Sequence, residues 1–216
     1  MSGMGAAMAG GNPKSGAQQE DGFYPTPWEA TQALLNVEKF EGIIHEPCCG
    51  DGAMAKVLIA NGYTVKSSDK VNRGFGVQRD FFTVTKPVAH NIVTNPPFEI
   101  KAITEEVLGQ KKKRIVTPGI TAEDFILHGL TLQPRKMAFL LKSTFWHAAK
   151  RKKTFEAHRP RWIYPLTWRL DFLGGGSPVM ELSWFVWHRG NTEYPQTRLL
   201  DKPTVFPVAS LEKLAI

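Results

Sequence analysis

Short apolar runs alternate with segments of helical periodicity through the first half of the chain. The runs that predict buried strands lie at residues 42–47, 63–69 and 90–94. Between the first two, residues 53–62 place apolar side chains at helical spacing and end at Gly62, a residue typical of helix C-termini. An earlier helix is predicted to begin at Thr26-Pro27, with the hydroxyl as N-cap and the proline at the first helical position. Strand, glycine turn, helix and strand in this order indicate a doubly wound, parallel α/β sheet.

Beyond residue 100 the periodicity weakens and then returns. Residues 101–120 contain four consecutive basic side chains and predict a mobile, basic surface insertion with room for a short helix. The elements expected after it are a helix at 121–132 with Thr121 as N-cap, a strand at 135–142, a basic helix at 148–158, and strands at 161–166 and 180–190.

The same pattern predicts the domain organisation. Residues 1–20 are rich in Gly, Ala, Ser and Gln and cannot offset the entropy of ordering, so a flexible tail is expected there. Residues 21–190 are expected to form one domain, because 216 residues suffice for one well-packed core. Residues 191–216 are expected to be a peripheral C-terminal tail.

Composition narrows the class of partner. The chain has 27 Lys and Arg against 20 Asp and Glu, a net charge of +7 and a pI near 9.4, which favours nucleic acid. No apolar run approaches the roughly 20 residues of a membrane helix, and no signal pattern opens the chain, so neither a membrane nor export is expected. The two cysteines are adjacent and unsuited to a disulfide, which favours a reduced, cytoplasmic environment. His147 and His158 lack the spacing of metal ligands, so no metal is expected.

A glycine turn joins the first predicted strand to its helix, in the order Glu46, Pro47, Cys48, Cys49, Gly50, Asp51, Gly52. Glycines let the backbone approach a ligand closely, and the helix N-terminus favours polar or anionic groups such as a carboxylate. The spacing lacks the third glycine of the dinucleotide fingerprint and the lysine of a phosphate-binding loop, so a nucleotide without phosphate fits better. A purely structural turn is the alternative, and the two thiols are expected to pack rather than react.

Two acidic residues, Asp69 and Asp80, lie between the glycine turn and the strand predicted at residues 90–94. Asp69 ends the second strand, where a carboxylate can accept both hydroxyls of a ribose; a solvated loop aspartate is the alternative. Asp80 can accept a hydrogen bond from an exocyclic amine, and Phe81 can lie against a purine ring.

The tetrapeptide Asn95-Pro96-Pro97-Phe98 follows the third predicted strand. In a parallel sheet it should lie at the same edge as the glycine turn. The prolines lack N–H donors and fix two φ angles, so the Asn95 side chain and the nearby carbonyls are held as acceptors. Acceptors that converge on one point suit an amino group used as a nucleophile; the alternative is a rigid turn that ends a strand.

In this order "EPCCGDG", "SSD", "RDF" and "NPPF" resemble the motifs of S-adenosylmethionine-dependent amino-methyltransferases that act on adenine in DNA. The upstream "FYPTP" resembles the cofactor-methionine motif of the subgroup in which it precedes the glycine loop. The similarity is greatest to small phage-type DNA adenine-N6 methyltransferases, and it covers about residues 22–190. It implies a Rossmann-like class I methyltransferase fold, with a seven-stranded, mostly parallel sheet and helices on both faces. It also implies a cytoplasmic protein, in a bacterial host cell if the gene is phage-encoded.

The resemblance assigns a role to each matching residue. The residues implied to bind S-adenosylmethionine are Tyr24, Thr26, Pro27, Glu46, Pro47, Gly50, Gly52, Asp69, Asp80, Phe81 and Asn95. Of these, the "FYPTP" residues border the methionine, Asp69 holds the ribose, and Asp80 and Phe81 meet the adenine. The implied catalytic residues are Asn95, Pro96, Pro97 and Phe98, which position the target amine and stack on a flipped base.

Two basic runs are the candidates for contacting DNA, since the chain has no room for a large target-recognition domain. The residues are Lys111, Lys112, Lys113, Arg114, Lys150, Arg151, Lys152 and Lys153. Either run also suits a solvated surface. Trp184, Phe185 and Trp187 are expected in the core rather than in a stacking platform.

Three functions remain open at this point. The tetrapeptide also suits transfer to an RNA base or to a protein glutamine, although the early "FYPTP" and the basic runs favour DNA. A catalytically silent nucleic-acid-binding module is a different class, and the intact Asn95, Asp69 and glycine loop argue against it. Oligomeric state is not indicated by the sequence.

Overall fold

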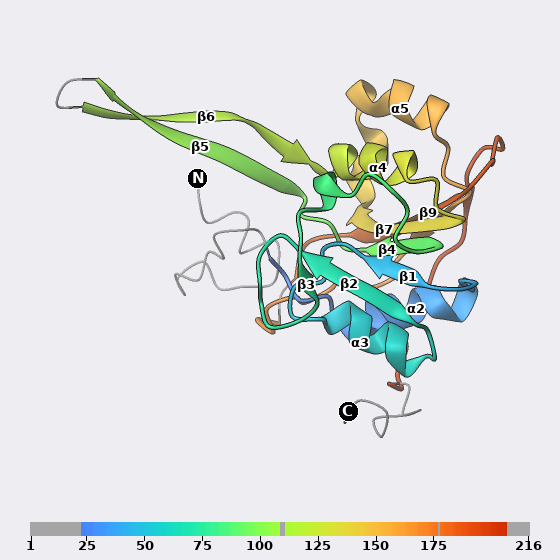
Figure 1. Cartoon of the computed structure of the whole chain (residues 1–216). Coiled ribbons are helices and arrows are strands. Elements are labelled where there is room, and N and C mark those ends of the chain that lie inside the picture. Colours follow the sequence, from blue (N-terminus) through green and yellow to red (C-terminus); the bar gives the residue numbers. More distant parts are fainter. Residues whose placement is uncertain (1–22, 109–110, 177, 207–216) are drawn as a thin grey trace.

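The computed structural model describes residues 23–108, 111–176 and 178–206. The flexible tail predicted at residues 1–20 lies outside them. Within them, eight strands form one sheet in the order β10-β8-β9-β7-β4-β1-β2-β3 (Figure 1). Their bounds are β1 Ile44–Glu46, β2 Val65–Asp69, β3 Val77–Gln78, β4 Asn91–Thr94, β7 Lys136–Lys142, β8 Trp162–Pro165, β9 Leu182–His188 and β10 Gln196–Thr197.

Strand direction puts several loops at one edge of the sheet. β3, β2, β1, β4 and β7 run parallel to one another, and β9 lies antiparallel between β7 and β8. The carboxyl ends of β1, β2, β4 and β7 therefore meet at the same edge, where ligands bind in open α/β sheets.

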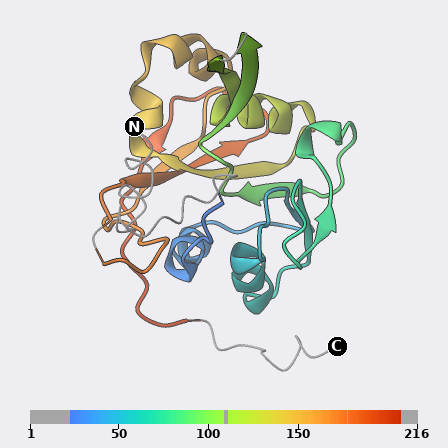
Figure 2. The ribbon, with the colours of Figure 1, turned by 90° about the vertical axis from the view of Figure 1, so that its left-hand side faces the viewer.

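Helices cover both faces of the sheet, as expected. α2 (Trp28–Val37) and α3 (Ala53–Ala60) lie on one face, and α4 (Ala122–Thr131) and α5 (Lys152–Ala157) on the other (Figures 1 and 2). Single 3₁₀ turns occur at η1 (Phe81–Thr83), η2 (Ser143–His147) and η3 (Ala149–Arg151), so the basic helix expected at 148–158 is η3 followed by α5. In the described part of the chain, no helix has the length and apolar character needed to cross a membrane.

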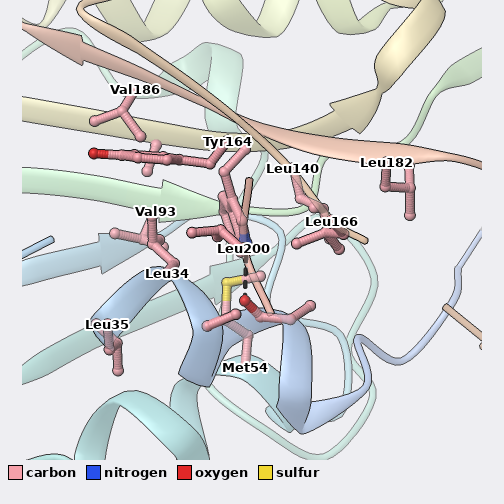
Figure 3. Close-up of a cluster of buried hydrophobic side chains, with 14 of the residues drawn as sticks. Leu34, Leu35, Met54, Val93, Leu140, Tyr164, Leu166, Leu182, Val186 and Leu200 are labelled. Atoms are coloured by element: carbon pink, nitrogen blue, oxygen red, sulfur yellow. Dashed lines mark hydrogen bonds between the residues drawn. The ribbon is translucent and has the colours of Figure 1, made fainter. Parts of the chain in front are cut away.

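Alternating side chains of the central strands build a core on each face. In β7, Ala138 and Leu140 join the cluster under α2 and α3 that Figure 3 shows, whereas Phe139 and Leu141 join the cluster under α4. Because both faces are covered, such strands read as continuous apolar runs. Trp184, Phe185 and Trp187 of β9 are 0%, 0% and 4% exposed, which confirms their predicted place in the core.

Two threonines were predicted to be helix N-caps, and the structure confirms only one of them. Thr121 is the N-cap of α4, and the Asp124 carboxylate accepts from its amide at 2.7 Å and its hydroxyl at 2.9 Å. The prediction for Thr26 was wrong: Pro27 is the N-cap of α2, and no side chain caps this helix. The Thr26 hydroxyl instead accepts a hydrogen bond from Asn95, a long-range contact with no local signal.

The predicted insertion forms a hairpin rather than a short helix. β5 (Glu99–Leu108) and β6 (Lys111–Thr121) pair antiparallel and project away from the sheet (Figures 1 and 2). The register places Ile103 opposite Val116 and Thr104 opposite Ile115. Because β-branched residues favour an extended backbone, this segment forms strands rather than a helix.

The segment predicted as a peripheral tail contributes to the fold. Gln196–Thr197 pairs in parallel with β8, which is why the sheet has eight strands instead of seven. Leu200 is 3% exposed and bridges to Leu166 in the core. Residues 207–216 lie outside the described residues.

A buried ionic cluster joins the strands at the edge opposite the ligand-binding edge. The Glu38 carboxylate accepts from Lys136 at 2.6 Å and from the Tyr164 hydroxyl at 2.8 Å, with His188 at 3.7 Å. Burial by itself would raise the pKa of Glu38, but these three neighbours lower it to about 2. The ionised carboxylate therefore stabilises the fold.

Replacing Glu38 with Gln should lower the free energy of unfolding near neutral pH by roughly 2–3 kcal/mol, because Lys136 loses its partner. The pKa is lowered on folding, so the stabilisation is complete above the usual value of 4.5 and is lost as pH falls toward 2. Thermal unfolding should show the difference between wild type and variant shrinking over that range. Glu41→Gln is the control, because Glu41 is 89% exposed and 3.9 Å from Arg135; an equal effect of both variants would contradict this account.

Candidate functional site

A cavity of about 270 Å³ opens at the carboxyl edge of the sheet. Its walls come from the segment before α2, the loops after β1, β2 and β4, η1, and the start of α4. The predicted residues that line it are Tyr24, Thr26, Glu46, Pro47, Asp69, Asp80, Phe81, Asn95, Pro96, Pro97 and Phe98. Residues from five separate stretches of sequence therefore meet at one place.

The glycine loop has a backbone that only glycine adopts easily. Gly50 and Gly52 have φ values of +55° and +82°, in the left-handed region. A Cβ at Gly50 would lie 2.0 Å from the Phe23 ring, and one at Gly52 would lie 2.5 Å from the Phe75 ring. Both the positive φ angles and the close approach of the two aromatic rings therefore require glycine at these positions.

Asp69 ties the second strand to this loop. Its carboxylate accepts from the Gly50 amide at 2.8 Å and from the Val71 amide at 2.9 Å. A carboxylate has about four acceptor sites, so two remain for hydroxyl groups of a ligand.

Asp80 and Phe81 differ in how they meet the cavity. Asp80 caps η1 by accepting from the Phe82 amide at 3.0 Å and pairs with Lys70 at 3.1 Å. Phe81 lines the cavity but is only 2% exposed, and its ring lies parallel to that of Phe125 with centroids 6.1 Å apart. Phe82, which is half-buried, also lines the cavity and offers more ring surface to a ligand.

Glu46 presents a buried acceptor. It is 2% exposed, and its Oε2 atom has no hydrogen-bond partner among the described residues. Burial raises the pKa of this carboxyl well above its usual range, and the nearby Asp69 and Asp51 raise it further, whereas a hydrogen bond from the Ala55 backbone lowers it. A cationic ligand group beside Oε2 would favour the ionised form.

Asn95 presents a second buried acceptor atom. Its Nδ2 donates to the Thr26 hydroxyl at 3.1 Å, which holds the side-chain amide in one orientation. The Oδ1 atom is then left buried, with no hydrogen-bond partner in the described part of the chain. Pro96 is buried and Pro97 half-buried, so the backbone carrying this acceptor is held rigidly.

Two aromatic rings line the same cavity as the two acceptors. Phe98 is half-buried, and the Lys142 ammonium lies 5.2 Å from its ring centroid. Tyr24 packs against Phe172 with centroids 5.8 Å apart. Both rings line the cavity, and both pack against the buried cluster beneath α2 and α3.

The two thiols of the loop behave as packing groups. Burial raises the pKa of Cys48 well above its usual range and that of Cys49 to about 12, so neither is a ready thiolate. Both cysteines are free. In the residues described, no three His, Cys, Asp or Glu side chains are grouped to hold a metal ion.

The predicted DNA-contacting residues lie outside the cavity. Lys150, Lys152 and Lys153 are exposed on η3 and α5. Arg151 is not available in the same way: its guanidinium lies 3.9 Å from the Phe145 ring centroid and 3.8 Å from Glu123. The other run, residues 111–114, begins β6 near the tip of the hairpin.

Sequence reasoning missed part of the lining. The further residues are Phe23, Pro25, Asp51, Ala53, Met54, Lys70, Val71, Arg73, Phe82, Ile120 and Phe125, and the two cysteines that were expected to pack, Cys48 and Cys49, also line the cavity. Phe23 is the first residue of the "FYPTP" motif and Asp51 stands inside the glycine turn, so their positions in the sequence alone pointed to them. Arg73 and Phe125 carry no local signal, because only the folding of distant loops brings them to the cavity.

Comparison with known proteins supports the fold. Neither the protein-family models nor the curated proteins include a match to this sequence. A Listeria monocytogenes protein assigned to the class I S-adenosylmethionine-dependent methyltransferases has a similar structure, with a TM-score of 0.54 and 14% identity over 94% of this chain and 72% of that one. A Pyrococcus horikoshii protein assigned as an RNA methyltransferase is also similar, with a TM-score of 0.54 and 12% identity over 81% of this chain and 90% of that one.

A modification subunit assigned to a type I restriction enzyme of Vibrio vulnificus is also similar, with a TM-score of 0.52 and 11% identity over 89% of this chain. The present chain spans 50% of that subunit's length. Together with the strand order and the antiparallel β9, these similarities show that the chain has the class I methyltransferase fold.

The cavity fits the cofactor that this fold implies. S-adenosylmethionine carries an ammonium, a sulfonium and two ribose hydroxyls. The unpartnered Glu46 Oε2 suits a cation, and the free acceptor sites of Asp69 suit the hydroxyls. The tight turn at Gly50 leaves no room for a side chain beside Phe23.

Gly50→Ala should weaken binding of S-adenosylhomocysteine by roughly 10-fold or more, because the new methyl group displaces Phe23 from the loop. Isothermal titration calorimetry measures the affinity. Gly62→Ala is the matched control: Gly62 also has a positive φ, +86°, but a Cβ there meets nothing within 4 Å. Both variants should lose roughly 1–2 kcal/mol of stability from the left-handed backbone. Equal affinities in the two variants would show that the contact with Phe23 is irrelevant to the ligand.

Proposed function

We propose that the protein is an S-adenosylmethionine-dependent methyltransferase that acts on the N6 amine of adenine in DNA. The observation that carries this proposal is the buried Oδ1 atom of Asn95, which lines the cavity without a partner while Thr26 holds the amide. An unpaired buried acceptor costs free energy unless a ligand uses it. A donor from a substrate is the natural partner for this atom.

An aromatic amine has the matching chemistry. Its lone pair is delocalised into the ring, so the nitrogen is a weak nucleophile. Two acceptors that draw both N–H groups out of the ring plane favour an sp³-like nitrogen. Asn95 Oδ1 supplies one acceptor and the Pro96 carbonyl the other, on a backbone that two prolines stiffen. Asn95 and Pro96 thereby aim the lone pair, and no covalent intermediate with the protein is required.

The other half of the cavity suits the methyl donor. S-adenosylmethionine supplies an electrophilic methyl group on a sulfonium. Glu46 would bind the cationic amino group, Asp69 the ribose hydroxyls, and Asp80 the adenine amine. Tyr24, Thr26 and Pro27 would border the methionine, and Gly50 and Gly52 would let the backbone approach it.

Phe98 would hold the acceptor base. A base in a duplex must leave the stack before it can reach the cavity, at a cost of a few kcal/mol. Stacking on an aromatic ring is worth roughly 1–3 kcal/mol, which offsets part of this cost. The Lys142 ammonium beside the Phe98 ring adds positive charge where a polyanion would enter.

DNA as the polymer is supported by the basic character of the chain and by the exposed Lys150, Lys152 and Lys153. Arg151 would act indirectly, by holding η3 against Phe145 and Glu123. The phage-type motif order, with "FYPTP" ahead of the glycine loop, favours the same substrate.

The test is transfer of a labelled methyl group from S-adenosylmethionine to DNA, RNA and protein in separate reactions, followed by nucleoside and amino-acid analysis. The expected product is N6-methyladenine in DNA. Label in an RNA base or in glutamine, with none in DNA adenine, would overturn the choice of substrate. Label in none of the three would overturn the enzymatic function.

The hairpin offers a second prediction, because its register separates the four basic residues of β6. Lys113 and Arg114 stand opposite Glu106 and Glu105, whereas Lys111 and Lys112 stand opposite Leu108 and Val107. In this register Lys111 and Lys112 have no acidic residue in the paired position. Lys111 and Lys112 are therefore the ones expected to contact phosphates.

The double variant Lys111→Gln with Lys112→Gln should bind DNA roughly 10-fold more weakly near physiological salt. The slope of log affinity against log salt concentration should become less steep by up to about 2. Fluorescence anisotropy over a salt series measures both quantities. The control is the double variant Glu106→Gln with Lys113→Gln, which leaves the net charge unchanged and should bind within about twofold of wild type. A control variant that binds as weakly as the test variant would contradict the assignment.

A further inference from the structure

A second pocket lies on the surface beside α5. Its volume is about 340 Å³, and its walls come from η2, η3, α5 and the loop before β10. The side chains that decide its chemistry are Trp146, His147, Lys152, Glu156, Arg159 and Tyr194. Two aromatic rings and two cations therefore share one pocket, and none of these residues lines the cofactor cavity.

Tyr194 is an exposed ring that its neighbours hold in place. The residue is 74% exposed, and the Arg159 guanidinium lies 4.2 Å from its ring centroid. Arg159 is itself fixed, because its Nη1 donates to the Thr192 carbonyl at 2.8 Å. The Asn191 side-chain amide donates to the carbonyls of Arg159 at 3.4 Å and Glu193 at 3.1 Å, which fastens the loop. A large ring is thus oriented at the surface, where a ligand that stacks on it offsets the cost of exposing and ordering it.

Trp146 supplies the second ring of the pocket. It is half-buried, and its ring packs against that of Phe155 with centroids 4.4 Å apart. Phe155 is 7% exposed and belongs to the buried cluster under α4. The core therefore fixes this wall of the pocket before any ligand binds.

The charge around the pocket suits a polyanion. The Lys152 side chain is 75% exposed, and its only printed-distance neighbour of opposite charge is Glu156, at 3.6 Å. An exposed ion pair of this kind contributes little free energy, so a phosphate can replace Glu156 as the partner of the ammonium. Lys150 and Lys153 are exposed beside it. Aromatic rings together with lysines are the combination by which proteins bind unpaired nucleotides.

The first turn of α4 links this pocket to the cofactor cavity. α5 lies beside α4 on the same face of the sheet (Figures 1 and 2). The Thr154 hydroxyl of α5 donates to the Glu123 carboxylate of α4 at 2.6 Å, and Phe125, in the same turn as Glu123, lines the cavity. A polynucleotide whose target base enters the cavity can therefore continue over η3 to the pocket.

We propose that this pocket is a second nucleic-acid subsite, which binds one unpaired nucleotide of the DNA outside the target base. The base stacks on Tyr194 and Trp146, and Lys152 contacts the adjoining phosphate. Because a base inside a duplex has both faces covered by its neighbours, the subsite selects DNA with a single-stranded segment. The inference rests on the proposed function for DNA as the polymer but not for the methyl transfer.

The experiment measures binding of the full chain, without cofactor, to three labelled DNA probes by fluorescence anisotropy. The probes are a single strand of mixed sequence, a strand of equal length made of stable abasic analogues, and the full duplex of the first strand. Tyr194→Ala should bind the single strand roughly 10-fold more weakly, the scale of one base–aromatic stack. It should bind the abasic strand and the duplex within about twofold of wild type, and the retained duplex binding confirms that it is folded.

Two further variants serve as controls for the ring. Tyr194→Phe keeps the aromatic face, so it should bind all three probes within about twofold of wild type. Leu199→Ala removes another exposed apolar side chain, 64% exposed, from the same C-terminal segment and should also leave all three affinities unchanged.

Lys152→Gln separates the phosphate contact from the stack. It should weaken the single strand and the abasic strand by the same factor of several-fold, because a phosphate contact does not need a base. The slope of log affinity against log salt concentration should become less steep by about 0.7 for the single strand. An unchanged affinity for both strands would contradict the phosphate contact.

Equal weakening of the base-bearing and abasic strands by Tyr194→Ala would mean that the ring merely supports the surface, and unchanged binding of all probes would mean that no base reaches the pocket. Either result overturns the inference. Unchanged DNA binding together with a loss of self-association in Tyr194→Ala, measured by sedimentation, would overturn it in favour of a second copy of the chain as the partner.

The proposed function fails separately. Wild type that binds the duplex but not the single strand would overturn the subsite alone, whereas wild type that binds no DNA would overturn both. Absence of methyl transfer, with the effects of Tyr194→Ala as expected, would overturn the proposed enzymatic function only.

Discussion

The hydrogen bond between Thr26 and Asn95 is the contact on which the site depends. It joins residues 69 positions apart in the sequence, one before α2 and the other after β4. The bond fixes the Asn95 amide, so that its Oδ1 atom stays buried, oriented and available. Thr26 belongs to the same segment as Tyr24, which also lines the cavity. One long-range bond therefore orients the proposed acceptor and joins the segment before α2 to the loop after β4.

Around this contact, the acidic residues shape the loops as well as offering acceptor atoms. Asp69 holds the amides of Gly50 and Val71, and Asp80 holds that of Phe82, so each carboxylate is oriented before a ligand arrives. The rigid sheet beneath, with buried side chains on both faces, keeps these loops in register. Such preorganisation lowers the free-energy cost of binding and of positioning reacting groups.

Much of the sheet and site could be predicted, because their signals are local. The ends of the strands were marked by prolines, glycines, apolar runs and the motif at Asn95, and the fold brings these strand ends together. The N-cap at Thr121 was also predicted from a local signal. The errors have a common cause in long-range contacts. Thr26 was predicted as an N-cap, but its hydroxyl accepts a hydrogen bond from Asn95. The packing of Phe125 against Phe81 at the cavity is likewise a long-range contact without a local signal. The hairpin depended on cross-strand pairing, which helical and strand periodicity do not reveal.

The measurement that tests the central claim most directly separates cofactor binding from methyl transfer in Asn95→Ala. Single-turnover transfer of label to DNA adenine should fall by roughly 100-fold or more, on the scale seen when one preorganised polar group is removed from an active site. The affinity for S-adenosylhomocysteine should stay within a few-fold of wild type, because Glu46, Asp69 and the glycine loop are untouched. Transfer at the wild-type rate, or a loss of transfer fully explained by lost cofactor affinity, would contradict the role of Asn95 as the acceptor that positions the amine.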